Sequence, residues 1–246
     1  MPLFEAIISG FVQGITEFLP VSSSGHLVIL EHLLGKGKEF GFIIFVHIGT
    51  LIALLLFFWR DILSLLTNKR MLFLLLIASI PAGIVGFTCG DTISQLFAQK
   101  NSVGIMLLVN GVWLLSADIS LRRKKERAVL LSFSSAFLIG CAQVAALIPG
   151  ISRSGITIST GILCNLEKET AFKFSFLLSI PVILGAFLFA LKNSCPSWDW
   201  AVVFAIIIST ISGLFSLKFF LHLIKKSKLF IFALYCFLIG IAILML

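Results

Sequence analysis

The chain has 246 residues, of which 59% are hydrophobic and 12% are charged, and its mean hydropathy is +1.12. Soluble domains average about 45–50% apolar and about 25% charged residues, so this composition excludes an ordinary soluble domain and indicates lipid as the solvent. The net charge of +8 is no sign of nucleic acid. The Lys and Arg residues lie between apolar runs, as the positive-inside bias of membrane proteins predicts, and we expect no nucleic-acid partner.

Apolar runs close to the length of a bilayer-crossing helix follow one another along the chain. Because lipid cannot satisfy free backbone groups, continuous runs of this kind predict helices. The first apolar region, Leu3–Leu34, is interrupted at "LPVSSSG", and a later one, Ala128–Leu166, is interrupted at "IPGISRSG". We predict uninterrupted spans, in chain order, over Phe42–Trp59, Met71–Thr88, Val103–Asp118, Phe174–Leu191, Ala201–Leu221 and Leu229–Leu246.

Three connections hold twelve Lys and Arg residues: the loop after Trp59, the "RRKKER" segment and the stretch from Lys218 to Lys228. The charge bias places these connections in the cytoplasm, so Phe42–Trp59 and Phe174–Leu191 run in opposite directions. A shift of 130 residues aligns the two interruptions without a gap and matches Gly10 with Gly140, Gln13 with Gln143, Ser22 with Ser152, Ser24 with Ser154 and Gly25 with Gly155.

The sequence therefore predicts an all-α, polytopic membrane helix bundle. We expect it to be an inverted-topology repeat with two re-entrant broken segments, and the site to lie where the repeats meet. The expected organisation is a single integral membrane domain over 1–246, with halves at about 1–120 and 128–246.

The first interruption places ionisable and hydroxyl side chains inside an apolar region. Gln13 and Glu17 lie four residues apart, hence on one helical face, and Pro20 ends the helix. Ser22–Ser24 then supply hydroxyls and backbone donors before His26. A helix break with serine caps would account for the proline and one serine, but not for Glu17, because an ionisable group in a membrane segment is costly and usually functional.

The second interruption carries a cation. Arg153 lies in "PGISRSGIT", and an arginine at membrane depth costs at least about 2.5–3.5 kcal/mol on insertion scales. An anion is its natural partner because guanidinium matches phosphate oxygens bidentately. Hydroxyls of Ser152, Ser154 and Thr157 and the start of a helix near Ser154 favour the same ligand. An arginine that snorkels to the interface is the alternative.

Together the two interruptions suit phosphoryl transfer. Glu17 is a candidate ligand of a divalent cation, and His26 is a candidate base, acid or nucleophile. His47 and Asp118 are weaker candidates. A transporter of polyprenyl phosphate or another anion is the alternative function, because inverted repeats and broken helices are also transporter features.

The quoted residues resemble a known family. "QGITEFLPVSSSGH" and "PGISRSGIT" are similar to the two signature motifs of the undecaprenyl-diphosphate phosphatase family of the bacitracin-resistance type. The resemblance also covers "HIGTLIALLLFFWRD", "FSFLLSIPVILGA" and the "ALY" near the C-terminus, and so nearly the whole chain.

The resemblance implies hydrolysis of undecaprenyl diphosphate to undecaprenyl phosphate and phosphate, which recycles the lipid carrier for peptidoglycan synthesis and confers bacitracin resistance. It implies a bacterial inner-membrane protein whose site opens to the periplasmic side, a divalent cation (Mg²⁺ or Ca²⁺), a polyprenyl diphosphate and membrane lipids as partners, and a homodimer as one assembly. The expected catalytic residues are Glu17, Ser23, His26 and Arg153. The expected metal ligands are Glu17 and Gln13, and the expected substrate-binding residues are Ser22, Ser24, Gly25, Ser152, Ser154 and Thr157.

The chain departs from the family pattern at several positions. Gln13 stands where many members have a glutamate, which leaves one acidic ligand in that motif. Ser24 stands where threonine is common, and Ile43 and Cys236 stand where an acidic residue and an arginine often occur. The first departure bears on metal binding, and we assign no catalytic role to the last two positions.

Overall fold

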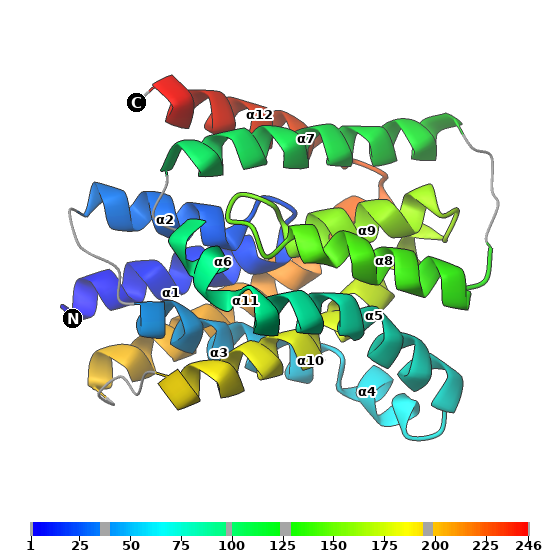
Figure 1. The fold of residues 1–246 in the computed structure, drawn as a ribbon, viewed down its shortest axis with the longest axis horizontal. Coiled ribbons are helices and arrows are strands. Elements are labelled where there is room, and N and C mark those ends of the chain that lie inside the picture. The colour runs from blue at the N-terminus through cyan, green and yellow to red at the C-terminus, as the bar shows by residue number, and fades with distance from the viewer. Residues whose placement is uncertain (1, 35–39, 97–99, 124–128, 194–198, 246) are drawn as a thin grey trace.

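The computed structural model describes residues 2–34, 40–96, 100–123, 129–193 and 199–245, which form helices and connecting turns without a strand (Figure 1). The helices are α1 (Leu3–Phe18), α2 (Ser23–Leu33), α3 (Phe40–Phe57), α4 (Trp59–Leu65), α5 (Lys69–Thr88), α6 (Gly90–Leu96), α7 (Lys100–Arg123), α8 (Phe133–Ala145), α9 (Arg153–Leu163), α10 (Lys168–Asn193), α11 (Trp200–Lys225) and α12 (Phe230–Met245). The predicted all-α bundle is confirmed.

Each uninterrupted span predicted from the sequence corresponds to one helix: α3, α5, α7, α10, α11 or α12. Four of the described helices are long and apolar enough to cross a membrane, and the bent pair of α3 and α4 would be a fifth. The prediction of a loop after Trp59 is wrong in part, because helix α4 begins at Trp59 after a 76° bend in the chain. A helix of 7 residues is too short to show a periodic pattern in the sequence.

The two interrupted regions form helical hairpins that enter from opposite ends of the molecule. In Figure 1, α1 runs from the left end to the middle and α2 returns to the left, whereas α8 runs from the right end to the middle and α9 returns to the right. A shift of 130 residues carries the first residue of α1, Leu3, onto that of α8, Phe133, and Ser23 of α2 onto Arg153 of α9. This arrangement is the predicted inverted repeat with two re-entrant broken segments.

The repeats exchange helices across their boundary. Helix α1 packs along α11 of the other half, and α8 packs along α5. The close contacts correspond too, since an added Cβ at Gly10 would collide with the backbone of Ala205 and one at Gly140 with the backbone of Ala78. Glycine at these positions lets each re-entrant helix touch the backbone of its partner helix.

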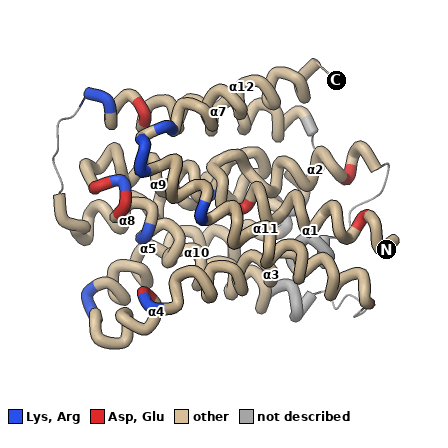
Figure 2. The backbone as a smooth tube through the Cα atoms, turned by 180° about the vertical axis from the view of Figure 1, so that it is seen from behind, with Lys and Arg blue, Asp and Glu red and all other residues tan. Residues whose placement is uncertain are grey.

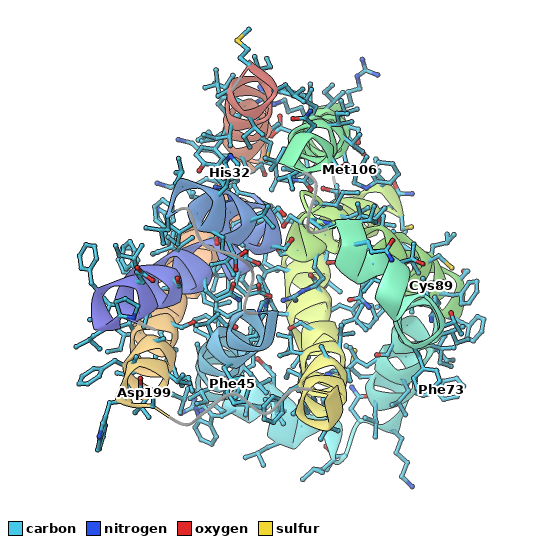
Figure 3. All side chains as sticks on the ribbon, turned by 60° about the vertical axis from the view of Figure 1, so that its left-hand side comes forward. His32, Phe45, Phe73, Cys89, Met106 and Asp199 are labelled. Carbon is cyan, nitrogen blue, oxygen red and sulfur yellow. The ribbon has the colours of Figure 1, made fainter. Side chains whose placement is uncertain are left out.

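The outside of the bundle is apolar, and its charge gathers at one end. The view along the helices in Figure 3 shows side chains such as Phe73 pointing outward, and 57% of the Phe73 surface is exposed. Figure 2 shows most Lys and Arg at the end of the bundle that holds α4 and the start of α5. Lys36 and Lys38 lie outside the described residues.

Candidate active site

The first break is a sharp turn that the sequence builds around Pro20. Helix α1 ends at Phe18, and Leu19 turns to extended geometry with φ −68° and ψ 145°. Ser22 then adopts a left-handed φ of 69°, unusual for a residue with a side chain. Its Oγ accepts the Gly25 N–H at 3.2 Å and so caps α2.

The second break repeats this construction. Ser152 caps α9 by accepting the Gly155 N–H at 3.1 Å. The Oγ atoms of Ser152 and Ser154 are 3.1 Å apart, and those of Ser22 and Ser24 are 3.2 Å apart. These serines and glycines, expected to bind substrate, therefore also build the two turns.

A residue that the sequence reasoning missed holds the two breaks together. Asn110 on α7 is 1% exposed; its Nδ2 donates to the Pro20 carbonyl at 2.9 Å, and its Oδ1 accepts the Ser152 N–H at 3.1 Å. The Ser154 hydroxyl also donates across, to the Leu19 carbonyl at 3.3 Å. A single Asn in an apolar helix gives no sequence signal of this role.

Glu17 lies at the junction of the halves and collects donors from both. The Ser23 hydroxyl donates to Glu17 Oε2 at 2.6 Å, and Gln13 Nε2 donates to the same oxygen at 3.1 Å. From the second break, Arg153 Nη2 donates to Glu17 Oε1 at 2.7 Å. His47 of α3 joins the cluster with Nε2 at 3.6 Å from Oε2. The Glu17 and Arg153 side chains are 7% and 13% exposed, so the ion pair is buried.

Two polar atoms of this cluster have no partner among the described residues. Arg153 Nη1 and Gln13 Oε1 are both buried without a hydrogen bond. A buried, unpartnered donor and acceptor each cost free energy, roughly 1–3 kcal/mol, more for the charged group. These two atoms therefore fit a ligand that offers an acceptor oxygen to Arg153 and a hydrogen-bond donor or a cation to Gln13.

His26 lies one turn after Ser22, and its described contacts lead away from Glu17. Its Nδ1 is 2.8 Å from the Ser22 carbonyl oxygen, and its Nε2 is 2.7 Å from the hydroxyl of Tyr235 on α12. The sequence reasoning included Tyr235 only as part of the family resemblance.

The remaining candidates have structural partners. The Thr157 hydroxyl donates to the Arg153 carbonyl at 2.7 Å and lies 2.5 Å from the Ser175 hydroxyl on α10, so Thr157 positions the first turn of α9. Asp118 accepts from Arg122 at 2.6 Å and from the Phe230 N–H at 3.1 Å, which joins α7 to α12 rather than to the Glu17 cluster.

The donor set for a metal ion is small. The described residues contain no group of three or more His, Cys, Asp and Glu side chains that could hold one. Mg²⁺, however, is usually bound by one or two carboxylates together with substrate phosphates and water. Glu17 and the unpartnered Gln13 Oε1 fit a cation of that kind, whose coordination is completed by the substrate.

Comparison with known proteins decides the family. Residues 6–242 match the model of the family described as bacitracin resistance protein BacA. The chain belongs to the BacA family. The match confirms the resemblance found in the sequence, and together with the apolar helices it makes the chain a multi-pass membrane protein.

Relatives in the BacA family cover the chain end to end. A protein of Halothermothrix orenii named undecaprenyl-diphosphatase is 41% identical over 100% of this chain and 98% of its own. One of Methanobrevibacter smithii with the same name is 39% identical over 100% and 98%. One of Shouchella clausii, named undecaprenyl-diphosphatase 1, is 35% identical over 99% and 96%.

Proposed function

We propose that this chain hydrolyses undecaprenyl diphosphate to undecaprenyl phosphate and phosphate. The observation that carries the proposal is the buried Glu17–Arg153 pair between two re-entrant breaks, with Arg153 Nη1 left free for a phosphate oxygen. A site at the end of two half-crossing hairpins suits a lipid whose head group is charged and whose tail stays in the bilayer. The names of the relatives support this substrate.

The proposed chemistry starts from the serine and its carboxylate. The Ser23 hydroxyl donates to Glu17 at 2.6 Å, the arrangement in which a base takes the proton of an attacking hydroxyl. Ser23 Oγ would bond to the terminal phosphorus, and the phosphoanhydride bond would break with undecaprenyl phosphate as the leaving group. Arg153 holds a phosphate oxygen through Nη1 while Nη2 stays on Glu17, and it offsets the charge that develops on the transferred group. In the second step His26 would take a proton from the water that attacks the phosphoserine. The Ser23 Oγ–P bond would then break, phosphate would leave, and Glu17 would return its proton to Ser23.

A divalent cation is part of the proposal. Glu17 and Gln13 Oε1 would hold Mg²⁺ or Ca²⁺ together with the diphosphate oxygens. The ion would neutralise negative charge on the diphosphate. With one carboxylate in the set, substrate and cation bind together rather than in sequence.

The cellular role follows from the reaction. Undecaprenyl phosphate produced by the chain would return to peptidoglycan synthesis, and removal of the diphosphate would deprive bacitracin of its target. The end rich in Lys and Arg would face the cytoplasm of the bacterial inner membrane, and the site would open to the opposite, periplasmic side. If two chains formed a homodimer, each chain would keep its own site, because all the residues of the site come from one chain.

The test is phosphate release from undecaprenyl diphosphate by purified protein in detergent, with Mg²⁺, with Ca²⁺ and with chelator. Wild type is expected to release phosphate only with a divalent cation. Glu17→Ala and Arg153→Ala are expected to release none, while Arg123→Ala, at an exposed cation in the last turn of α7, serves as the control.

The inverted repeat with broken helices also favours a carrier for an anionic lipid. In that case folded wild type would bind undecaprenyl phosphate without releasing phosphate from the diphosphate. Arg153→Ala would then weaken binding. The Ser23–Glu17 hydrogen bond of 2.6 Å would have no catalytic use in a carrier.

A further inference from the structure

Tyr235 contacts His26 from a helix that neither signature motif includes. Its hydroxyl lies 2.7 Å from His26 Nε2, and the two rings stack with centroids 5.7 Å apart and an interplanar angle of 10°. The contact joins residues 209 positions apart in the chain. It therefore depends on how α12 is placed against the first break.

The other ring nitrogen fixes the direction of this hydrogen bond. His26 Nδ1 lies 2.8 Å from the Ser22 carbonyl oxygen, which can only accept. In the neutral imidazole, Nδ1 therefore carries the proton and Nε2 carries the lone pair. It follows that the Tyr235 hydroxyl donates to Nε2.

The carbonyl that fixes the ring is itself held firmly. Ser22 has a left-handed φ of 69°, and its carbonyl also accepts the His26 N–H at 3.1 Å. Its Oγ accepts the Gly25 N–H at 3.2 Å. Ser22 thus cannot turn its carbonyl away without undoing the start of α2.

The position of Tyr235 is held just as firmly. The next residue, Cys236, is 0% exposed; its sulfur accepts from Asn110 Nδ2 at 3.3 Å and lies 3.7 Å from the Pro20 carbonyl. Helix α12 also meets α7 closely, where a Cβ on Gly240 would approach the Gly104 carbonyl to 2.9 Å. Helix α12, which carries the tyrosine, is therefore joined to both breaks through Asn110 and Cys236.

We propose that Tyr235 is a positioning residue for His26. Its hydroxyl donates to Nε2 and its ring stacks on the imidazole, which fixes the orientation and tautomer of His26 for proton transfer in the hydrolysis. This inference rests on the proposed function. In the hydrolysis, water or substrate would take the place of the hydroxyl at Nε2, on a ring whose orientation and tautomer are already set by the stacking and by the Ser22 carbonyl.

The first experiment compares Tyr235→Phe with wild type. Phe keeps the stacked ring and removes the donor, so we expect kcat to fall by about 10-fold to 100-fold, the cost of slight misplacement of a catalytic group. KM should stay within about twofold, because Tyr235 acts through His26 rather than on the substrate. Leu238→Ala, which changes a 60% exposed, lipid-facing side chain of the same helix, is the control.

A second readout needs no turnover. In protein labelled with ¹⁵N-histidine, and assigned with a His26→Asn variant, the Nε2 resonance of His26 should be that of a lone-pair nitrogen that accepts a hydrogen bond. In Tyr235→Phe it should move to the position of a free lone-pair nitrogen. If wild type releases no phosphate, the proposed hydrolysis fails, yet this measurement still tests the Tyr235–His26 bond.

The chain holds a single tyrosine, so feeding 3-fluorotyrosine labels Tyr235 alone. Its ¹⁹F resonance should shift on replacement of His26 by Asn and on addition of a non-hydrolysable diphosphate lipid. An unchanged Nε2 resonance in Tyr235→Phe, or a kcat within twofold of wild type in a variant of normal thermal stability, would overturn the proposal.

Discussion

At the level of single residues, the buried ion pair of Glu17 and Arg153 constrains the chemistry most. Taking two charges out of water is expensive, and the pair repays that only through good geometry and further hydrogen bonds. Glu17 has those bonds, whereas Arg153 has one guanidinium nitrogen without a partner. The arginine is thus held by the protein on one side and left open on the other.

Replacing Arg153 by Lys should separate these two uses of the guanidinium. Lysine keeps the charge but is a point donor that cannot hold Glu17 and a phosphate oxygen in one fixed plane. We expect kcat/KM for phosphate release to fall by about 10²–10³-fold, as when one donor to a developing oxyanion is removed. Arg122→Lys, at an ion pair outside the cluster whose arginine is exposed, should leave kcat/KM unchanged. Full activity in Arg153→Lys would refute the proposal that the guanidinium holds Glu17 and a phosphate oxygen at once.

Gln13→Glu adds a second carboxylate next to Glu17. Because hard cations prefer charged oxygen ligands, we expect half-maximal phosphate release at a lower Mg²⁺ or Ca²⁺ concentration, by about tenfold. Gln13→Met, which removes the unpartnered oxygen, should shift the requirement the other way. The check is a metal titration of the initial rate, and identical titration curves for the three proteins would exclude Gln13 as a ligand.

At the scale of elements, close helix contacts decide how the re-entrant hairpins sit. Gly10→Ala and Gly140→Ala place a methyl group against the backbone of a helix from the other half. Overpacking of this kind costs typically about 1–3 kcal/mol, so we expect a lower midpoint of thermal unfolding in detergent for both variants. Gly83→Ala is the matched control, because a Cβ there meets nothing within 4 Å. Equal midpoints of thermal unfolding for all three variants would show that the two close contacts accommodate a methyl group without loss of stability.

Asn110 joins the breaks as elements, since it binds a carbonyl of one and an N–H of the other. In Asn110→Ala the buried Ser152 N–H loses its partner, at about 1–3 kcal/mol, and the Pro20 carbonyl keeps only the weak thiol donor of Cys236. We expect a lower unfolding midpoint together with a lower kcat/KM, because Arg153 follows Ser152 directly. Asn101→Ala at the exposed start of the same helix should change neither. Activity that stays normal in Asn110→Ala would mean that the breaks keep their register without it.

The elements that the sequence predicted well have strong local signals. Spans and breaks follow from runs of apolar residues and from Pro, Gly and Ser, which act within a few positions. Asn110, Tyr235 and Ser175 could not be found this way, because each acts on a residue far along the chain. The serines show a further limit, since the sequence allowed both serine caps and hydroxyls for a ligand, and the fold shows that Ser22 and Ser152 are the ones that cap helices.

The whole molecule is two halves that are each completed by the other. Helix α1 lies on α11, and α8 lies on α5. A chain split between Lys125 and Glu126 should therefore give fragments that are each degraded when produced alone. Produced together, they should co-purify through a tag on one of them and release phosphate. A protease-resistant half on its own would show that the exchanged contacts are dispensable.

The exchange of helices also sets an order of events during biosynthesis. Glu17 leaves the ribosome 136 residues before Arg153, its partner in the ion pair. At about 5–20 residues per second the ribosome needs roughly 7–27 s to bridge that gap, and α11, which covers α1, comes later still. The first hairpin is thus made 136 residues before the arginine that pairs with its carboxylate. We expect its stable entry into the bilayer to follow synthesis of the second half of the chain.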